Sequence, residues 1–280
     1  EFKNKGIDVF IDAMGQLNRN NGLGKEVLAF ILVPAGHAGA NKELLHNLEL
    51  PYQAVTSTDL YLTHYLNDSA NDPVMNRIRA QKLRNSEEDK VKIFFVPSYL
   101  NGDDGVLNMP YYDLLVGMDL TAFPSYYEPW GYTPLESLAF KVPTITTTLA
   151  GFGLWVKEHY NMNHPGIEVI HREDGDASNV ATAIAEWVKN YTQVGETEMQ
   201  KDRDNAKDVS RIALWDNLIN YYKQAYTIAL NQVSVRLKDL PANMNESVSY
   251  IEKQLTVNNP SWVSVMIHRS IPEKLIALEE

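Results

Sequence analysis

Short apolar runs alternate with longer amphipathic patterns along most of the chain, and this alternation constrains the fold more than any other feature. The run Val27–Val33 stops at Pro34, and the run Val91–Val96 stops at Pro97. Both runs have the length and composition of strands that are buried on two faces. The expected strands cover residues 27–33, 91–96, 119–123, 142–147 and 167–171. Strands that alternate with helices form a mostly parallel sheet, so we predict an α/β fold with helices on both faces.

Helical patterns fill the segments between these runs. Apolar residues at 7, 10, 11, 14 and 17, for example, lie on one face of a helix. Helices are expected at residues 7–17, 111–118, 134–140, 176–192, 197–209 and 211–230. Residues 41 to about 83 are also mostly helical in pattern, with breaks near Pro51 and Asp72-Pro73. We expect a turn at Gly36–Gly39 and a loop at Asn101–Gly105.

The alternation stops near residue 231. Proline and asparagine then interrupt short pieces that show no strand–helix rhythm. We therefore predict one domain over residues 1–230, followed by a tail or connector to a following domain over residues 231–280. The chain begins without methionine and stops in mid-pattern for a helix, so we expect a fragment of a longer protein.

Composition excludes several kinds of partner. The net charge is −11 and the pI is about 5.1, which disfavours non-specific binding of nucleic acid or of acidic membranes. A local site can still hold a small anion. The chain has no cysteine, which rules out disulfides and thiolate metal sites and fits a cytoplasmic location. No apolar run reaches the roughly 18 residues that a membrane span needs.

One loop carries an unusual set of side chains. The stretch Phe123-Pro-Ser-Tyr-Tyr-Glu-Pro-Trp-Gly-Tyr-Thr-Pro-Leu-Glu136 holds four rings in its first eight positions and two carboxylates. Loops are normally polar, so these rings need an explanation. Thr133 suits a helix N-cap, Pro134 the first helical position and Glu136 a capping box. A helix N-terminus favours phosphate, and Gly131 lets a ligand approach the backbone closely.

Glu128 is harder to explain by local structure. It precedes Pro129, which biases it toward an extended conformation. A carboxylate beside an anion site can bind hydroxyl groups or stabilise positive charge. The alternative is an exposed loop glutamate without a function.

The same stretch resembles the glycogen synthases of the fungal and animal type, glycosyltransferase family 3. Supporting motifs are Val142-Pro-Thr-Ile-Thr-Thr, Ala150-Gly-Phe-Gly153, Lys3-Asn-Lys-Gly-Ile-Asp-Val-Phe10 and the helix from Trp215. The resemblance covers residues 1 to about 230 and includes the paired glutamates of retaining transferases. It implies a Rossmann-like domain, namely the carboxyl-terminal, nucleotide-sugar-binding half of a GT-B glycosyltransferase.

The resemblance also implies roles for individual residues. Glu128 would be catalytic, contacting the transferred glucose and supporting charge at its anomeric carbon. The implied donor-binding residues are Lys5 at the departing diphosphate, Tyr111 against the base, Trp130, Gly131, Tyr132 and Thr133 at hydroxyls and phosphate, and Glu136 at the ribose. A half-buried tyrosine with no ligand is the alternative for Tyr111. Lys5 and the helix terminus would be preorganised against the charge that develops on the diphosphate, so no metal and no cofactor is expected.

The other candidate sites are expected to be ordinary structural features. The seven histidines form no HxxxH pair, and each is expected to be solvated or packed. Asp174-Gly-Asp176 imitates a metal-binding motif, but its glycine favours a turn. Gly151-Phe-Gly153 is expected to be a turn near the site.

The sequence also departs from the family. An arginine expected just upstream of Lys5 and the amino-terminal Rossmann-like half lie outside the chain. The segment Met199–Lys207 carries mixed charges where the yeast and animal enzymes have regulatory arginines, so we expect no activation by glucose-6-phosphate. Residues 271–280 are similar to the lead-in of some bacterial α-glucan phosphorylases, so a phosphorylase domain is a possible following partner. The alternative for this segment is an ordinary amphipathic helix.

The expected function is transfer of glucose from a nucleotide-glucose, UDP-glucose first, to an α-1,4-glucan. One alternative is a related transferase with another donor or acceptor, such as a sucrose synthase-like or ADP-glucose-dependent enzyme. The other is a module that only binds a nucleotide-sugar.

Overall fold

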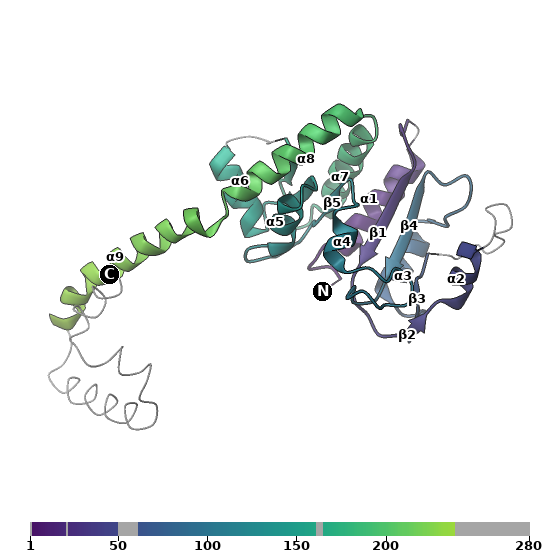
Figure 1. The fold of residues 1–280 in the computed structure, drawn as a ribbon, viewed down its shortest axis with the longest axis horizontal. Helices are drawn as coiled ribbons and strands as arrows, with labels where there is room; N and C mark the ends of the chain where they lie inside the picture. The colour runs from purple at the N-terminus through teal and green to yellow at the C-terminus, as the bar shows by residue number, and fades with distance from the viewer. Residues whose placement is uncertain (1, 21, 50–60, 161–164, 239–280) are drawn as a thin grey trace, which may run out of the picture. The chain divides into compact units, whose positions relative to one another are not determined.

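The computed structural model describes residues 2–20, 22–49, 61–160 and 165–238 (Figure 1). The chain divides into two compact units, Glu1–Ile212 and Ala213–Glu280. The helices are α1 (Ile7–Arg19), α2 (Lys42–Glu49), α3 (Pro73–Ala80), α4 (Tyr111–Leu115), α5 (Tyr132–Ala139), α6 (Gly151–Tyr160), α7 (Ala177–Tyr191), α8 (Glu196–Arg211) and α9 (Trp215–Lys238). The strands are β1 (Val27–Leu32), β2 (His37–Ala40), β3 (His64–Leu66), β4 (Val91–Val96), β5 (Thr121–Ala122), β6 (Thr144–Thr147) and β7 (Ile167–Ile170).

The predicted parallel strands are present, which confirms the α/β class. β1 pairs with β4 in parallel, from Val27 opposite Val91 to Leu32 opposite Val96. β5, β6 and β7 form a second parallel group in that order. The strands therefore make two hydrogen-bonded parallel groups instead of the single sheet that the pattern suggested. All seven strands and helices α1–α8 lie in the first unit.

Two local predictions between residues 36 and 83 are wrong. Of the expected turn at Gly36–Gly39, residues 37–39 lie in β2, which pairs antiparallel with β3, from His37 opposite Leu66 to Ala40 opposite His64. This partner lies more than 20 residues away, so local turn chemistry does not reveal the pairing. The stretch expected to be mostly helical contains α2, α3 and the strand β3, while residues 50–60 lie outside the described part. The expected break at Asp72-Pro73 is the N-cap of α3, where the Asp72 carboxylate accepts from the Met75 amide at 2.9 Å.

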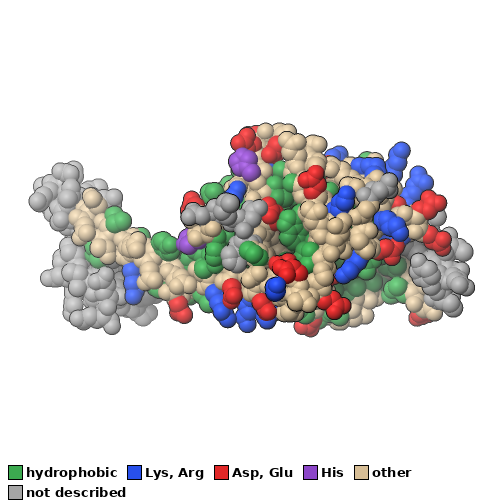
Figure 2. All heavy atoms as spheres, turned by 90° about the horizontal axis from the view of Figure 1, so that it is seen from above, with side chains coloured by type: hydrophobic (Ala, Val, Ile, Leu, Met, Phe, Trp, Pro, Cys, Tyr) green, Lys and Arg blue, Asp and Glu red, His purple; other side chains and the backbone are tan. Residues whose placement is uncertain are grey.

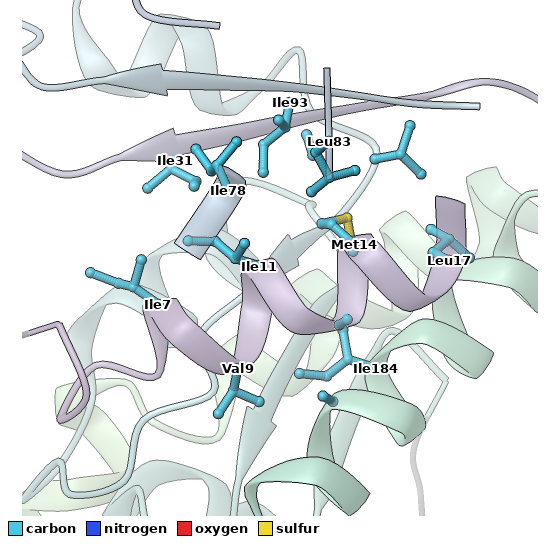
Figure 3. Close-up of a cluster of buried hydrophobic side chains, with 14 of the residues drawn as sticks. Ile7, Val9, Ile11, Met14, Leu17, Ile31, Ile78, Leu83, Ile93 and Ile184 are labelled. Carbon is cyan, nitrogen blue, oxygen red and sulfur yellow. The ribbon is translucent and has the colours of Figure 1, made fainter. Parts of the chain in front are cut away.

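Helix α1 is covered on two sides within the core of the first unit. Figure 3 shows Ile11 and Met14 on the side of Ile78 from α3 and Ile93 from β4, while Ile184 of α7 approaches from the other side. The side chains of α1 that are at most 1% exposed are Val9, Ile11, Ala13, Met14 and Leu17. Full burial of each large apolar side chain contributes about 1.5–3 kcal/mol. This burial fixes the position of α1, and with it the segment that precedes the helix.

The second unit is described only through α9 and the residues just before it. The predicted tail or connector over residues 231–280 therefore falls largely outside the described residues, and the domain boundary at residue 230 stays a prediction. Among the described helices, none combines the length and the apolar character that a membrane crossing requires.

A buried tyrosine on α7 gives a test of the packing. Tyr191 is 9% exposed, and its hydroxyl has no hydrogen-bond partner among the described groups. Its ring stacks on Trp187 with centroids 5.0 Å apart. Burial raises the pKa of Tyr191 from 10.0 to about 12. An unpaired buried hydroxyl destabilises the folded chain by about 1–3 kcal/mol.

Tyr191→Phe is therefore expected to raise the free energy of unfolding at pH 7 by about 1 kcal/mol, because it keeps the ring and removes the hydroxyl. The raised pKa adds a pH dependence: the wild type loses stability as pH rises from the unfolded value near 10 through the folded value of about 12. The variant lacks this loss. Urea unfolding at pH 7 and near pH 11 measures both effects. A destabilised variant at pH 7 would show that the hydroxyl has a partner.

Candidate functional site

The aromatic loop lies at the carboxyl end of β5 and is held by the segment before α1. The Phe123 amide donates to the Ile145 carbonyl of β6 at 2.8 Å. The Tyr126 amide donates to the Asn4 carbonyl at 2.7 Å, and the Asn4 side-chain amide donates to the Tyr127 carbonyl at 3.3 Å. Ligands of open parallel sheets bind beyond the carboxyl ends of the strands, and this loop is in that position.

Two predicted site residues, Lys5 and Glu128, meet in this arrangement. The Lys5 ammonium forms a hydrogen-bonded ion pair with the Glu128 carboxylate. The two side chains are 45% and 24% exposed, so both remain accessible to a ligand. Gly6, which follows, has φ +70° and lies so close to Pro124 that an added Cβ would overlap the Pro124 carbonyl oxygen. A glycine at this position therefore lets α1 begin directly beside the loop.

The other side of the loop is bound to the start of α6. The Glu128 amide donates to the Leu149 carbonyl at 3.2 Å, and the Gly151 amide donates to the Glu128 carbonyl at 3.0 Å. The Phe152 amide donates to the Trp130 carbonyl at 2.7 Å. The prediction of a turn at Gly151–Gly153 is wrong, since these residues form the first turn of α6. Gly151 is required there because a Cβ would overlap the Pro129 carbonyl oxygen.

Helix α5 begins earlier than predicted. Its N-cap is Gly131, with φ +107° and no side-chain cap, so the expected N-cap at Thr133 and the capping box with Glu136 are wrong. Hydrogen bonds join residues 128–130 to residues 149–152, and we infer that this tertiary pairing outweighs the local cap signal, so that the helix begins after Gly131. Thr133 and Pro134 lie in the first turn.

The start of α5 presents backbone donors that have no partner. Within the described part of the chain, the amides of Trp130, Gly131, Tyr132 and Thr133 donate no hydrogen bond. Such amides carry the partial positive charge of a helix N-terminus and suit an anion. They lie next to the catalytic candidate, since a Cβ on Gly131 would be 3.5 Å from Cγ of Glu128.

Glu136 faces the tyrosines of α4. Its charge raises the pKa of Tyr112 from 10.0, with a small contribution from a hydrogen bond. Burial and, to a smaller extent, the charge of Glu136 raise the pKa of Tyr111. Tyr111 is half-buried, whereas Tyr112 is 44% exposed and stacks on Phe140 with centroids 4.9 Å apart. The effect of the Glu136 charge on both pKa values indicates that Glu136 lies near α4, and sequence reasoning missed Tyr112, whose ring stacks on Phe140 at the end of α5.

The loop before α4 is anchored by a buried histidine. His64 is fully buried, with Nδ1 2.9 Å from the Thr63 hydroxyl and Nε2 2.8 Å from the Asp104 carbonyl. The Tyr111 amide donates to the Leu100 carbonyl at 3.0 Å. His64 is therefore a packed histidine, as expected, and it belongs to the scaffold that carries Tyr111.

Two of the four loop rings have structural partners. Trp130 packs edge-on against Phe152 of α6, with centroids 5.7 Å apart. The Tyr126 ring lies under the guanidinium of Arg172, and its hydroxyl donates to Asp174. Asp174 belongs to a turn around Gly175 at φ +83°, as predicted. The contribution of Arg172 was also missed, because an arginine that follows a strand carries no local signal of burial.

Charges of both signs are mixed on the surface of the described part of the chain (Figure 2). On the face drawn in Figure 2, Asp and Glu side chains are interspersed with Lys and Arg side chains over the described residues. At the loop, Lys5 and the unpaired amides at the start of α5 are groups that suit an anion. Among the described residues, no group of three or more His, Asp or Glu side chains is arranged to hold a metal ion. That the reaction needs no metal stays a prediction.

The site region falls within a known family. The family model of glycogen synthase matches residues 54–272, which include the loop, α4 and α5. The chain belongs to the glycogen synthase family. Lys5 precedes the matched residues, so the match itself does not cover the Lys5–Glu128 pair.

Curated glycogen synthases match most of the chain. Glycogen [starch] synthase isoform 2 of Saccharomyces cerevisiae is 28% identical over 83% of this chain and 42% of its own length. Glycogen [starch] synthase of Caenorhabditis elegans is 27% identical, covering 93% of this chain and 46% of its own length. Glycogen [starch] synthase, liver, of Rattus norvegicus is 26% identical, covering 83% of this chain and 40% of its own length. The chain therefore spans less than half of the length of these family members.

A search of solved structures matches WaaG, a glycosyltransferase involved in lipopolysaccharide biosynthesis. The TM-score is 0.34 with 15% identity, over 71% of this chain and 46% of that one. The α/β assignment rests instead on the hydrogen-bonded parallel strands described above.

Proposed function

We propose that this chain is the donor-binding, carboxyl-terminal half of a retaining GT-B glucosyltransferase. The whole enzyme would transfer glucose from a nucleotide-glucose, UDP-glucose first, to an α-1,4-glucan. One observation carries the proposal: in a member of the glycogen synthase family, the Lys5–Glu128 ion pair lies beside the unpaired amides at the start of α5. Carboxylate, ammonium and helix terminus are the groups that such a transfer requires.

The chemistry follows from the charges that develop. As the bond between the anomeric carbon and the phosphate oxygen breaks, the sugar becomes oxocarbenium-like and the electron pair leaves with the diphosphate. Glu128 supplies negative charge for the sugar, while Lys5 and the amides of residues 130–133 supply positive charge for the diphosphate. Groups already fixed in place stabilise this separation of charge without reorganising. The glucan hydroxyl then forms the new glycosidic bond to the anomeric carbon, and its proton goes to the departing diphosphate.

The neighbouring position of Tyr111 and Glu136 fits a nucleoside. Base and ribose are directly bonded in a nucleoside, so the groups that contact them must also be neighbours. The half-buried Tyr111 offers a ring for stacking, and the Glu136 carboxylate offers acceptors for ribose hydroxyls. Burial and the charge of Glu136 raise the pKa of Tyr111, and the same charge raises the pKa of Tyr112, which supports a shared site for base and ribose.

Binding of UDP tests this donor site. In the full-length protein, Tyr111→Ala and Lys5→Ala are each expected to weaken UDP binding about tenfold, because they remove a stacking ring and a phosphate-paired charge. Calorimetry gives the dissociation constants. Tyr65→Ala is the matched control, since Tyr65 is a 43% exposed tyrosine on β3. Equal affinity in the wild type and both site variants would contradict the mapped site.

Several finer assignments stay predictions. An amino-terminal Rossmann-like half would complete the cleft, in keeping with the 42% coverage of the yeast relative. A following phosphorylase domain rests on residues 271–280, which lie outside the described part. Parallel assays with UDP-glucose and ADP-glucose distinguish the two donors, and sucrose formation would identify sucrose synthase-like chemistry. A cytoplasmic location is likewise proposed.

A further inference from the structure

Arg172, which follows β7, is a buried charge that the reaction does not use directly. Arg172 is only 5% exposed. Nη1 donates to the Pro124 carbonyl, and the guanidinium carbon lies 5.3 Å from the centre of the Tyr126 ring. Within the described residues it forms no ion pair, and Nε has no hydrogen-bond partner.

Burying such a group is unfavourable unless its contacts compensate. Burial lowers the pKa of Arg172, while the charges of Asp8 and Asp176 act in the opposite direction. Arginine has so high an ordinary pKa that the side chain stays charged at neutral pH. Within the described residues, the hydrogen bond and the ring contact of the guanidinium both go to the loop, at Pro124 and Tyr126. The contacts that compensate for burying this charge therefore also hold the loop in place.

The segment that carries Arg172 is hydrogen-bonded to the residue that follows β6. Its backbone amide donates to the Thr148 hydroxyl at 3.0 Å, and Thr148 donates from its own amide to the Ile170 carbonyl of β7 at 3.0 Å. Two residues further on, Asp174 accepts a hydrogen bond from the Tyr126 hydroxyl. The segment after β7 thus holds Tyr126 by its ring and by its hydroxyl.

The Pro124 carbonyl is fixed from two directions. Gly6 lies against it on the side of α1, and Arg172 donates to it from the side of β7. Four residues later the loop presents Glu128, whose carboxylate meets Lys5. A shift of Pro124 would therefore move the carboxylate relative to the ammonium.

We infer that Arg172 is a positioning residue that locks the loop 124–128 between α1 and the end of β7, and so sets the place of the Glu128 carboxylate during glucose transfer. This inference rests on the proposed function of Glu128. It does not make Arg172 a group that contacts the sugar or the nucleotide.

The kinetic arm of the test compares Arg172→Met with the wild type in the full-length protein. We expect kcat for glucose transfer to fall about 100-fold, the effect of a small misplacement of a catalytic group, with a smaller change in the KM for the donor. In a Glu128→Ala background, Arg172→Met should cause no further fall. Arg77→Met is the matched control, because Arg77 pairs with Asp12 away from the loop, and its kcat should stay that of the wild type.

The structural arm does not depend on activity. The 280-residue chain has no cysteine, so Tyr127→Cys and Asn190→Cys provide two unique spin-label sites, one on the loop and one on α7. Double electron–electron resonance is expected to give a narrow distance distribution with Arg172 and a broader or shifted one with Arg172→Met. Arg172→Lys keeps the charge but not the planar fork, so both its kcat and its distribution should lie between those of the wild type and Arg172→Met.

The outcomes separate the two levels of the proposal. The inference is overturned if Arg172→Met has the wild-type kcat and an unchanged distance distribution. If the methionine variant does not fold, the same result in Arg172→Lys overturns it. A kcat that falls equally with and without Glu128 also overturns it, because Arg172 would then act elsewhere. If the wild-type protein transfers no glucose, the proposed function fails, whereas the label distances still decide whether Arg172 holds the loop.

Discussion

Glu128→Gln is expected to lower kcat for glucose transfer by about 100- to 1,000-fold in the full-length protein. The amide keeps the shape of the side chain but removes the charge that faces the developing oxocarbenium ion. Loss of one preorganised electrostatic group at a reacting centre has an effect of this size, about 3–4 kcal/mol in the transition state. Radioactive glucose incorporated into glycogen at saturating UDP-glucose measures kcat.

The fold of this variant should be nearly unchanged. The Lys5–Glu128 pair is partly exposed on both sides, and such pairs contribute about 0–1 kcal/mol to stability. Glu186→Gln is the control, because Glu186 is an exposed glutamate on α7. If Glu128→Gln retained the wild-type kcat, Glu128 would be an exposed loop glutamate and its catalytic assignment would be wrong.

Gly6→Ala is expected to destabilise the chain by about 2–5 kcal/mol. Gly6 has φ +70°, which costs an L-residue about 1–2 kcal/mol. The remainder comes from overlap between the new Cβ and the backbone of Pro124, since overpacking costs about 1–3 kcal/mol. Because Pro124 leads to Glu128, the variant should also lose transferase activity at temperatures where it is still folded. Urea unfolding of the 280-residue chain gives the stability.

Gly39→Ala separates backbone strain from steric overlap. Gly39 also has positive φ, +101°, but an added Cβ would meet nothing within 4 Å. We expect this variant to lose only about 1–2 kcal/mol. Equal losses in the two variants would show that α1 and the loop do not approach as closely as described.

The strands were predictable because their signal is local. Val91–Val96 and residues 27–32 are mainly apolar runs that end close to a proline, and Lys92 is the one polar residue within them. β2 and β3 carry no such run, since His37–Ala40 and His64–Leu66 are short and mixed. Their pairing depends on contacts between distant residues, which a pattern along the chain does not contain.

The start of α5 shows how tertiary contacts outweigh a local signal. Thr133, Pro134 and Glu136 form a plausible capping box, yet the helix begins after Gly131. The loop is bonded to the start of α6 through Glu128 and Trp130, and this pairing decides where the chain turns. The sequence identified the right helix, but it placed the N-cap at Thr133 instead of Gly131.

The pairing of Lys5 with Glu128 was only partly predictable. Resemblance to the family named both residues, yet 123 positions separate them and nothing local shows that they touch. Asn4 and Gly6 belong to the motif Lys3–Phe10, yet no local pattern shows that they and Arg172 bring the two segments together. Their contribution becomes visible only through the hydrogen bonds to the loop.

The most direct test of the proposed function is glucose transfer itself. Full-length protein is incubated with UDP-[14C]glucose and glycogen, and the label in glycogen is counted before and after digestion by an α-1,4-specific glucosidase. The proposed function predicts label that enters glycogen, is released by this digestion and depends on Glu128. No incorporation from either UDP-glucose or ADP-glucose, under conditions where UDP binds, would contradict it and leave a nucleotide-binding module.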